Sequence, residues 1–171
     1  MRIVPFLLLC LFGHFLPAQH CGYCGAALLV VRPHATGDGT VLKDLRITLL
    51  DSNNVPMTYG GRPFPPFFRN NDPDAFDALG VNHRPRHGDR LFPIAQDNYV
   101  LVIGLGTDLR GCSILVQDER NWRSGTVFVQ TIMPIPMGIP YSLCGRYDHE
   151  AYHMDANEAP FTVIDIPLAR R

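Results

Sequence analysis

The 171-residue chain has little charge, and lysine is almost absent from it. Charged residues make up 18% of the sequence, against about 25% in an average globular domain, and Lys43 is the only lysine among the 15 Lys and Arg residues. The formal net charge is −1 with neutral histidine. Nucleic-acid binding needs a basic surface that neutralises phosphates, so this composition argues against a nucleic-acid partner.

Long hydrophobic runs are missing beyond the start of the chain. A membrane-spanning helix takes about 20 apolar residues, and no segment of the sequence reaches that length, so we expect no membrane span. At the start, Arg2 precedes an apolar run that ends at Phe12, and Leu16 and Ala18 stand where a signal peptidase prefers an aliphatic and a small residue. A buried N-terminal element is the alternative.

Residues 1–18 are therefore predicted to be a cleaved signal peptide, and residues 19–171 a single secreted or periplasmic domain. Such compartments permit disulfides. Of the five cysteines, Cys10 leaves with the signal peptide, and an even number remains. Four cysteines allow three pairings, between which the sequence does not choose. The disulfide candidates are Cys21, Cys24, Cys112 and Cys144.

Short apolar runs separated by Pro, Gly and Asn dominate the predicted mature chain. In the clearest run, Leu45, Ile47 and Leu49 alternate with their neighbours, which places them on one face of a strand. No long stretch has the spacing of an amphipathic helix. The pattern predicts an all-β fold, and specifically an antiparallel β-sandwich. The expected strands cover residues 27–31, 45–50, 98–103, 113–117, 126–132 and 161–166.

A long proline-rich insertion is expected at residues 60–97. Its prolines exclude a central strand because proline has no ladder donor. A short helix is predicted inside the insertion. Asp72 would cap its start, Pro73 would occupy the first helical position, and Gly80 would follow the last helical residue. The insertion also carries an aromatic cluster that either covers one end of the sandwich or forms an exposed ligand or partner patch. This cluster comprises Phe64, Phe67 and Phe68.

Several segments resemble one family of β-sandwiches. The first part of the predicted domain resembles the opening of a transthyretin-like or carboxypeptidase-regulatory-like domain. The matching segments are the apolar run at 28–31, the segment at 39–45 that leads into the second strand, that strand with its final aspartate at 47–51, and the turn before Pro56. Residues 98–103 resemble a later strand of the same family. The resemblance implies a binding or structural module rather than an enzyme. We therefore expect an exported module without a cofactor, whose partner is an unidentified protein or small molecule.

One motif supports a catalytic alternative. His149, Glu150 and His153 form the pattern H-E-x-x-H, which on a helix lets both histidines bind zinc while the glutamate acts as general base. Zinc-peptidase helices usually carry a bulky apolar residue after the glutamate, whereas this chain has Ala151. A small zinc-dependent hydrolase, a non-catalytic metal site and a solvated loop all remain open here.

The sequence Cys21-Gly22-Tyr23-Cys24 supports a third function. It resembles the active site of exported thioredoxin-like disulfide isomerases, in which one thiolate is stabilised at a helix N-terminus. In that fold a strand precedes the pair, but here the pair lies close to the predicted mature N-terminus. A structural disulfide, or a link from this pair to Cys112 or Cys144, is the other interpretation.

Overall fold

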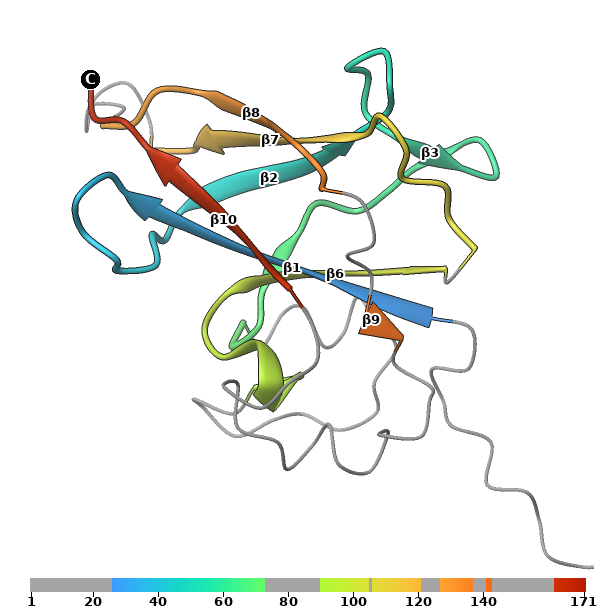
Figure 1. Ribbon diagram of the computed structural model, residues 1–171, viewed down its shortest axis with the longest axis horizontal. Helices are drawn as coiled ribbons and strands as arrows, with labels where there is room; N and C mark the ends of the chain where they lie inside the picture. Colours follow the sequence, from blue (N-terminus) through green and yellow to red (C-terminus); the bar gives the residue numbers. More distant parts are fainter. Residues whose placement is uncertain (1–25, 73–89, 105, 121–126, 137–140, 143–161) are drawn as a thin grey trace, which may run out of the picture.

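A computed structural model of the chain describes residues 26–72, 90–104, 106–120, 127–136, 141–142 and 162–171. Almost all regular structure in this part of the chain is β-strand (Figure 1). Its one helical element is a single 3-10 turn, η1 (Pro93–Ala95). The prediction of an all-β fold is therefore confirmed. The helix predicted after Asp72 falls on residues outside the described ranges.

The largest sheet is built around the first strand. Its strand order is β10 (Val163–Leu168), β1 (Ala26–Ala35), β6 (Tyr99–Gly104) and β5 (Phe68–Arg69), and β9 (Tyr141–Ser142) also pairs with β1. The β1–β6 and β5–β6 pairs are antiparallel. The β1–β10 pair is parallel, which departs from the antiparallel arrangement expected from the sequence. Parallel neighbours need a long connection, and the whole intervening chain supplies it.

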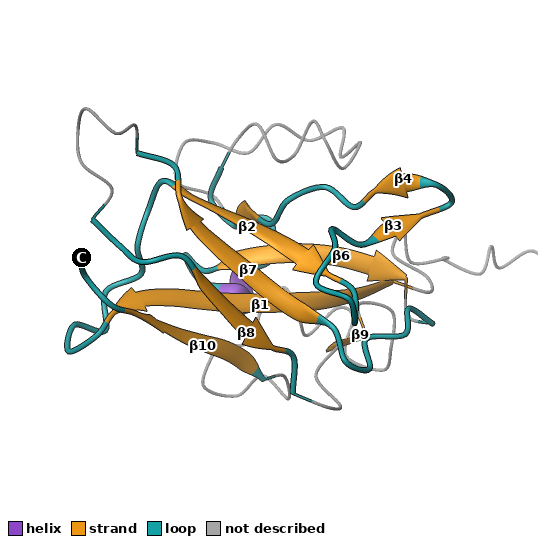
Figure 2. Cartoon of the chain, turned by 90° about the horizontal axis from the view of Figure 1, so that it is seen from above, coloured by secondary structure: helices purple, strands orange, loops and turns teal. Residues whose placement is uncertain are grey.

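Two smaller antiparallel sheets complete the described fold. One contains β2 (Leu45–Leu50), β7 (Ser113–Asp118) and β8 (Thr131–Pro134) in that order. The other is a hairpin of β3 (Thr58–Tyr59) and β4 (Arg62–Pro63). Seen from above, β2 and β7 run obliquely to β1 and β6 of the largest sheet (Figure 2).

Side chains from both larger sheets meet in one hydrophobic cluster. Leu45, Ile47 and Leu49 are all buried in it, so the face predicted for β2 is confirmed. β1 contributes alternate residues to this cluster, while Leu28 and Val30 face a second cluster on the other side of the sheet. A strand buried on both faces requires an uninterrupted apolar sequence, which explains the continuous run in β1.

Proline is tolerated within β1 because of an offset between its neighbours. β6 pairs only with residues 26–31, whereas β10 pairs with residues 30–35. On the side of β6, no strand pairs with β1 beyond residue 31, and only an isolated bridge joins His34 to Val41. The carbonyl oxygen of Pro33 accepts the Leu42 amide proton at 2.9 Å there, and the missing amide proton of Pro33 interrupts no strand ladder. β1 consequently continues to Ala35, beyond the predicted end at residue 31.

The strand predicted at residues 126–132 begins later than expected. Residue 126 is outside the described ranges, and β8 starts at Thr131. Before it, Phe128 forms only an isolated bridge with Arg170. The carboxylate of Asp118 accepts the amide protons of Val127 and Phe128, at 2.9 and 3.2 Å, so these donors are not available to a strand ladder.

Candidate functional site

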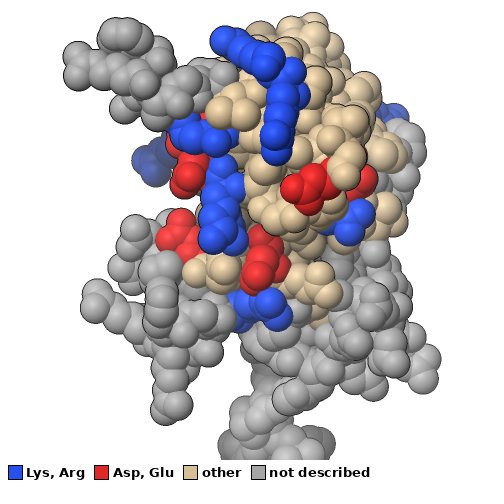
Figure 3. Space-filling view, turned by 90° about the vertical axis from the view of Figure 1, so that its left-hand side faces the viewer, with Lys and Arg blue, Asp and Glu red and all other residues tan. Residues whose placement is uncertain are grey.

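A cavity of about 570 Å³ opens where the ends of the two larger sheets meet. This end of the molecule, at which β2 begins and β7 ends, carries interspersed acidic and basic side chains (Figure 3). One wall of the cavity is apolar and the rest is mostly charged. The described residues that line it are Asp44, Leu45, Arg46, Pro65, Pro66, Phe67, Phe68, Arg69, Asp72, Tyr99 and Glu119.

The apolar wall is formed by the proline-rich segment and decides how the aromatic cluster is used. Phe67 is buried in the main core, and its amide donates to the carbonyl oxygen of Ile47 at 2.9 Å. Phe64 packs against the same core, and Phe68 packs against the second cluster. The aromatic residues therefore cover the core, and two of them, Phe67 and Phe68, also line the cavity.

Arg69 and Tyr99 are brought together by the pairing of β5 with β6. They are direct partners in this antiparallel ladder, so both side chains project from the same face of the sheet. Tyr99 is buried in the main core cluster, which shows that this is the inner face. Both residues line the cavity.

The Tyr99 hydroxyl has a proton to donate. Its oxygen accepts the amide proton of Leu45 at 3.3 Å, and the described residues provide no hydrogen-bond acceptor for its own proton. Burial raises the pKa of Tyr99, and the charges of Asp44 and Glu119 add to this rise, against the opposing effects of Leu45 and Arg69. The phenol therefore stays protonated throughout the neutral range and remains a donor.

Arg69 carries a second unused donor. Its Nε atom is buried and has no hydrogen-bond partner within the described part of the chain. A buried donor without an acceptor costs about 1–3 kcal/mol, so such groups are usually paired when a site is filled. Arg69 and Tyr99, which both line the cavity, therefore each carry a buried donor whose hydrogen-bonding capacity is incomplete.

Asn70 fixes the position of β5. Its Oδ1 accepts the amide proton of Phe92 at 2.8 Å, and its Nδ2 donates to the carbonyl oxygens of Phe92 and Gln96, each at 2.6 Å. Backbone bonds with Leu91 and Asn98 complete the connection. This fully buried amide ties the end of β5 to the loop before β6, which holds Arg69 opposite its partner.

Two exposed carboxylates stand at the rim of the cavity. The carbonyl oxygen of Asp44 accepts the Glu119 amide proton at 3.1 Å, which holds the start of β2 against the end of β7. Asp44 adopts a left-handed backbone conformation with φ of 58°, which aspartate tolerates better than most residues. Neither carboxylate has an ion-pair partner among the described residues, whereas the nearby Asp118 does.

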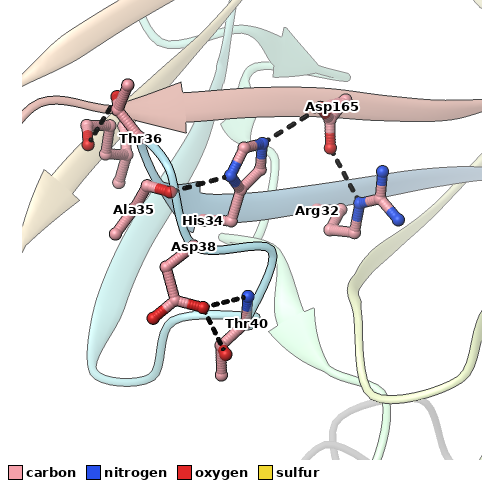
Figure 4. Close-up of polar contacts among 8 residues, drawn as sticks. Arg32, His34, Ala35, Thr36, Asp38, Thr40 and Asp165 are labelled. Carbon is pink, nitrogen blue, oxygen red and sulfur yellow. Dashed lines mark hydrogen bonds and ion pairs between the residues drawn. The ribbon is translucent and has the colours of Figure 1, made fainter.

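A separate polar cluster joins β1 to β10 (Figure 4). His34 Nε2 lies 3.0 Å from Asp165 Oδ2, and its Nδ1 lies 3.0 Å from the carbonyl oxygen of Ala35. Arg32 Nε donates to Asp165 Oδ1 at 2.7 Å. Both partners of the ring are acceptors, so only the doubly protonated imidazolium satisfies them together.

The charge of His34 follows from these contacts. Burial lowers the pKa of His34, but the hydrogen bonds to Ala35 and Asp165 outweigh it, and the pKa lies above its ordinary value of 6.5. Both ring nitrogens are occupied, so neither offers a lone pair for a metal or a substrate proton. His34 is the one histidine in the described ranges, and its role there is to hold two strands together.

The candidate residues predicted from motifs lie mostly outside the described part of the chain. This applies to His149, Glu150 and His153, so the zinc site stays a prediction. The described residues alone contain no group of three or more His, Cys, Asp or Glu side chains suited to a metal. They also contain no helix long and apolar enough to cross a membrane.

Cys112 is the one disulfide candidate within the described ranges. It is a buried free thiol in the structure, and burial raises its pKa. Its Sγ lies 3.7 Å from the carbonyl oxygen of Asp108, to which the thiol donates. Cys21, Cys24 and Cys144 are outside the described ranges, so the predicted disulfides among them remain untested.

Comparison of the chain with protein-family models, curated proteins and solved structures gives no match. The cavity therefore has to be interpreted from its own chemistry. Sequence reasoning missed Arg69 and Asn70, because neither belongs to a motif. The sequence did contain a weak signal for Arg69, because this residue directly follows the aromatic cluster of Phe64, Phe67 and Phe68. One of the two interpretations of that cluster was an exposed ligand or partner patch.

Proposed function

We propose that the protein is an exported binding module built on a β-sandwich, and that the cavity beside Arg69 and Tyr99 is its ligand site. The cavity itself carries this proposal. Its volume of about 570 Å³ falls within the range of roughly 300–1,000 Å³ that is usual for small-molecule sites. An apolar wall next to a few converging polar groups is also the usual composition of such a site.

The sandwich architecture is supported by the shared core. The inward side chains of the two larger sheets belong to a single cluster, as packing of two sheets face to face requires. The resemblance of residues 28–56 to transthyretin-like or carboxypeptidase-regulatory-like domains supports the same architecture. This resemblance implies a binding or structural role, and a binding role agrees with the chemistry of the cavity.

His34 takes no part in the proposed ligand site. This histidine is held by acceptors on both ring nitrogens and lies in the separate β1–β10 cluster. The polar groups of the cavity are arginines, carboxylates and a phenol that stays protonated near neutral pH. They are suited to hold charged groups.

Export is proposed from the first 18 residues alone. The charge at Arg2, the short apolar run and the small residue Ala18 support cleavage after residue 18. Expression in a host with a secretory pathway should release a protein that begins at Gln19, as measured by intact mass and N-terminal sequencing. Recovery of a full-length chain that still begins at Met1 in the cytoplasm would contradict export.

The ligand site is tested with neutral aromatic probes. We expect benzyl alcohol and indole to shift the backbone amide signals of Arg46, Phe68 and Arg69 in two-dimensional NMR spectra, because these residues line the cavity. Pro66→Trp should block the shifts by placing an indole over the apolar wall. Pro136→Trp, at an exposed position that does not line the cavity, serves as the matched control. Shifts that ignore Pro66→Trp, or none at cavity residues, would reject the proposed site.

A further inference from the structure

We propose that two copies of the chain associate through the free edge of β8, which pairs antiparallel with β8 of the second copy. β8 lies at the margin of its sheet (Figure 2), and within the described part of the chain it pairs with β7 alone. The unpaired backbone groups of an edge strand are a template for a further strand. No residue of β8 lines the cavity, so this surface is independent of the proposed ligand site.

The register of β8 shows which of its backbone groups point outward. The amide of Ile135 donates to the carbonyl oxygen of Cys112 at 3.0 Å, and these two residues continue the register of the β7–β8 ladder. Hydrogen-bonded and non-bonded pairs alternate along an antiparallel ladder. Met133 therefore bonds to β7, whereas the N–H and C=O groups of Ile132 point to the free edge. Pro134 also occupies an outward position, where its missing N–H costs no bond to β7.

The free edge lacks the charged residues that usually prevent strand addition. Residues 127–136 contain no Asp, Glu, Lys, Arg or His, whereas protected edge strands commonly carry lysine or another charge. Val129 and Ile132 are 43% and 48% exposed, and they are two of the four large hydrophobic side chains exposed in the described part of the chain. Two identical edges can therefore meet without like-charge repulsion, and their contact buries apolar surface.

A two-fold axis at Ile132 gives a register that satisfies the outward donors. Ile132 then faces Ile132 of the second copy, and each N–H donates to the carbonyl oxygen of the other. Two residues earlier, the Gln130 side chain accepts a hydrogen bond from Gln117 at 3.3 Å, which shows that the β7–β8 register extends to Gln130. The outward N–H of Gln130 meets the carbonyl oxygen of Pro134 of the second copy. The proline therefore acts only as an acceptor, which is the one role that its backbone allows.

The side chains at this edge favour a second copy over a charged peptide. The Ile132 side chains of the two copies meet across the axis, next to Leu115, the half-buried neighbour of Ile132 in β7. A charged peptide would find no opposite charge along residues 127–136. The contact uses the same surface on both copies, so it closes at two chains.

Sedimentation equilibrium of the purified protein tests the association. We expect the mass to rise from one chain to two with concentration, and Ile132→Lys to weaken dimerisation at least about tenfold because two ammonium groups then meet at the axis. Val55→Lys, at an apolar position that is 54% exposed outside β8, is the matched control and should dimerise like the parent. Circular dichroism checks folding. A one-chain mass at every concentration up to about 1 mM, or equal dimerisation of Ile132→Lys, would overturn the inference.

Amide hydrogen exchange of the unsubstituted chain locates the interface independently. We expect the Ile132 amide to exchange at least about tenfold more slowly where the dimer predominates than in dilute solution, because its N–H gains an acceptor only in the dimer. The Met133 amide already bonds to β7 and should change less. Protection that rises with concentration in other strands but not at Ile132 would place the contact elsewhere and reject the proposal. Assemblies larger than two chains would also contradict it.

Discussion

Asp108 and Asp118 occur in the same local sequence, Asp-x-Arg, but in different surroundings. Each carboxylate pairs with the arginine two residues later, with shortest distances of 2.7 Å. The Asp108 side chain is 59% exposed, whereas that of Asp118 is 0% exposed. Asp118 additionally accepts the amide protons of Val127 and Phe128, and its partner Arg120 lies over the Phe128 ring at 5.4 Å.

Replacing the buried carboxylate should therefore be costly. Asp118→Ala leaves the Arg120 charge and the two amide donors without an acceptor, so we expect a loss of about 2–4 kcal/mol in the free energy of unfolding at pH 7. Urea denaturation measures this loss. Asp108→Ala is the matched control and should leave the denaturation midpoint nearly unchanged, because solvent already screens that pair. Equal effects of the two substitutions would contradict the argument.

The pH dependence of Asp118 has a definite sign. The Arg120 guanidinium, helped by the backbone amides, lowers the pKa of Asp118 from 3.8 to about 2, against the effect of burial. Its contribution to stability is therefore complete above about pH 4 and is lost as the pH falls through about 2. In acid titrations followed by circular dichroism, Asp118→Asn should show less stability loss between pH 4 and pH 2 than the parent chain. An identical acid profile would exclude this linkage.

The stability that His34 contributes depends on pH in the opposite direction. Its pKa in the folded protein lies above 6.5, so the stability that it contributes is fully present below that pH and is lost as the pH rises through the folded value. His34→Gln should therefore destabilise the protein more at pH 5.5 than at pH 8.5, by up to about 1 kcal/mol because Asp165 is partly exposed. Urea denaturation at the two pH values checks this, and a pH-independent difference would be inconsistent with a charged His34.

At the scale of the elements, β2 gives the sharpest test of register. Ile47 is fully buried in the main cluster, whereas its neighbour Thr48 projects from the opposite face and is only half-buried. Ile47→Ala should reduce the free energy of unfolding by about 2–4 kcal/mol, since it removes core contacts and leaves a cavity. Thr48→Ala, its control on the same strand, should cost less than about 1 kcal/mol. A larger effect at Thr48 would mean that the strand presents its other face.

The elements also show which features of the sequence are predictive. Burial in β2 alternates from Leu45 to Leu49, and this local pattern was sufficient to place Leu45, Ile47 and Leu49 correctly. The start of β8 was placed too early because apolar residues near Phe128 look like a strand. Their amide donors are taken by Asp118, which lies in another element, and no local pattern reports that.

The candidate site was harder to predict for the same reason. Tyr99 was placed in a strand, but its partner Arg69 is joined to it by a ladder between segments about thirty residues apart. A two-residue strand such as β5 has no periodicity to recognise. The motif residues that did attract attention, His149 and His153, gave no information on the cavity. Short motifs are visible in a sequence, whereas pairing across a sheet edge is not.

At the scale of the whole molecule, the shared core predicts cooperative unfolding. The main hydrophobic cluster contains side chains from both larger sheets, namely from β1, β6 and β10 of one and from β2 and β7 of the other. Unfolding of either sheet would therefore expose the buried side chains of both. We expect a single thermal transition, with coincident midpoints from far-UV circular dichroism and from tyrosine near-UV circular dichroism. Two separated midpoints would show that the sheets unfold independently.

The parallel pairing of β1 with β10 has a consequence for synthesis. Arg32 and Asp165, which bridge these strands, are separated by 133 positions. During synthesis, the edge of β1 that pairs with β10 therefore stays without its partner strand until β10 has been translated. Because these contacts form only after nearly the whole chain has been made, compaction of this sheet is delayed until late in translation.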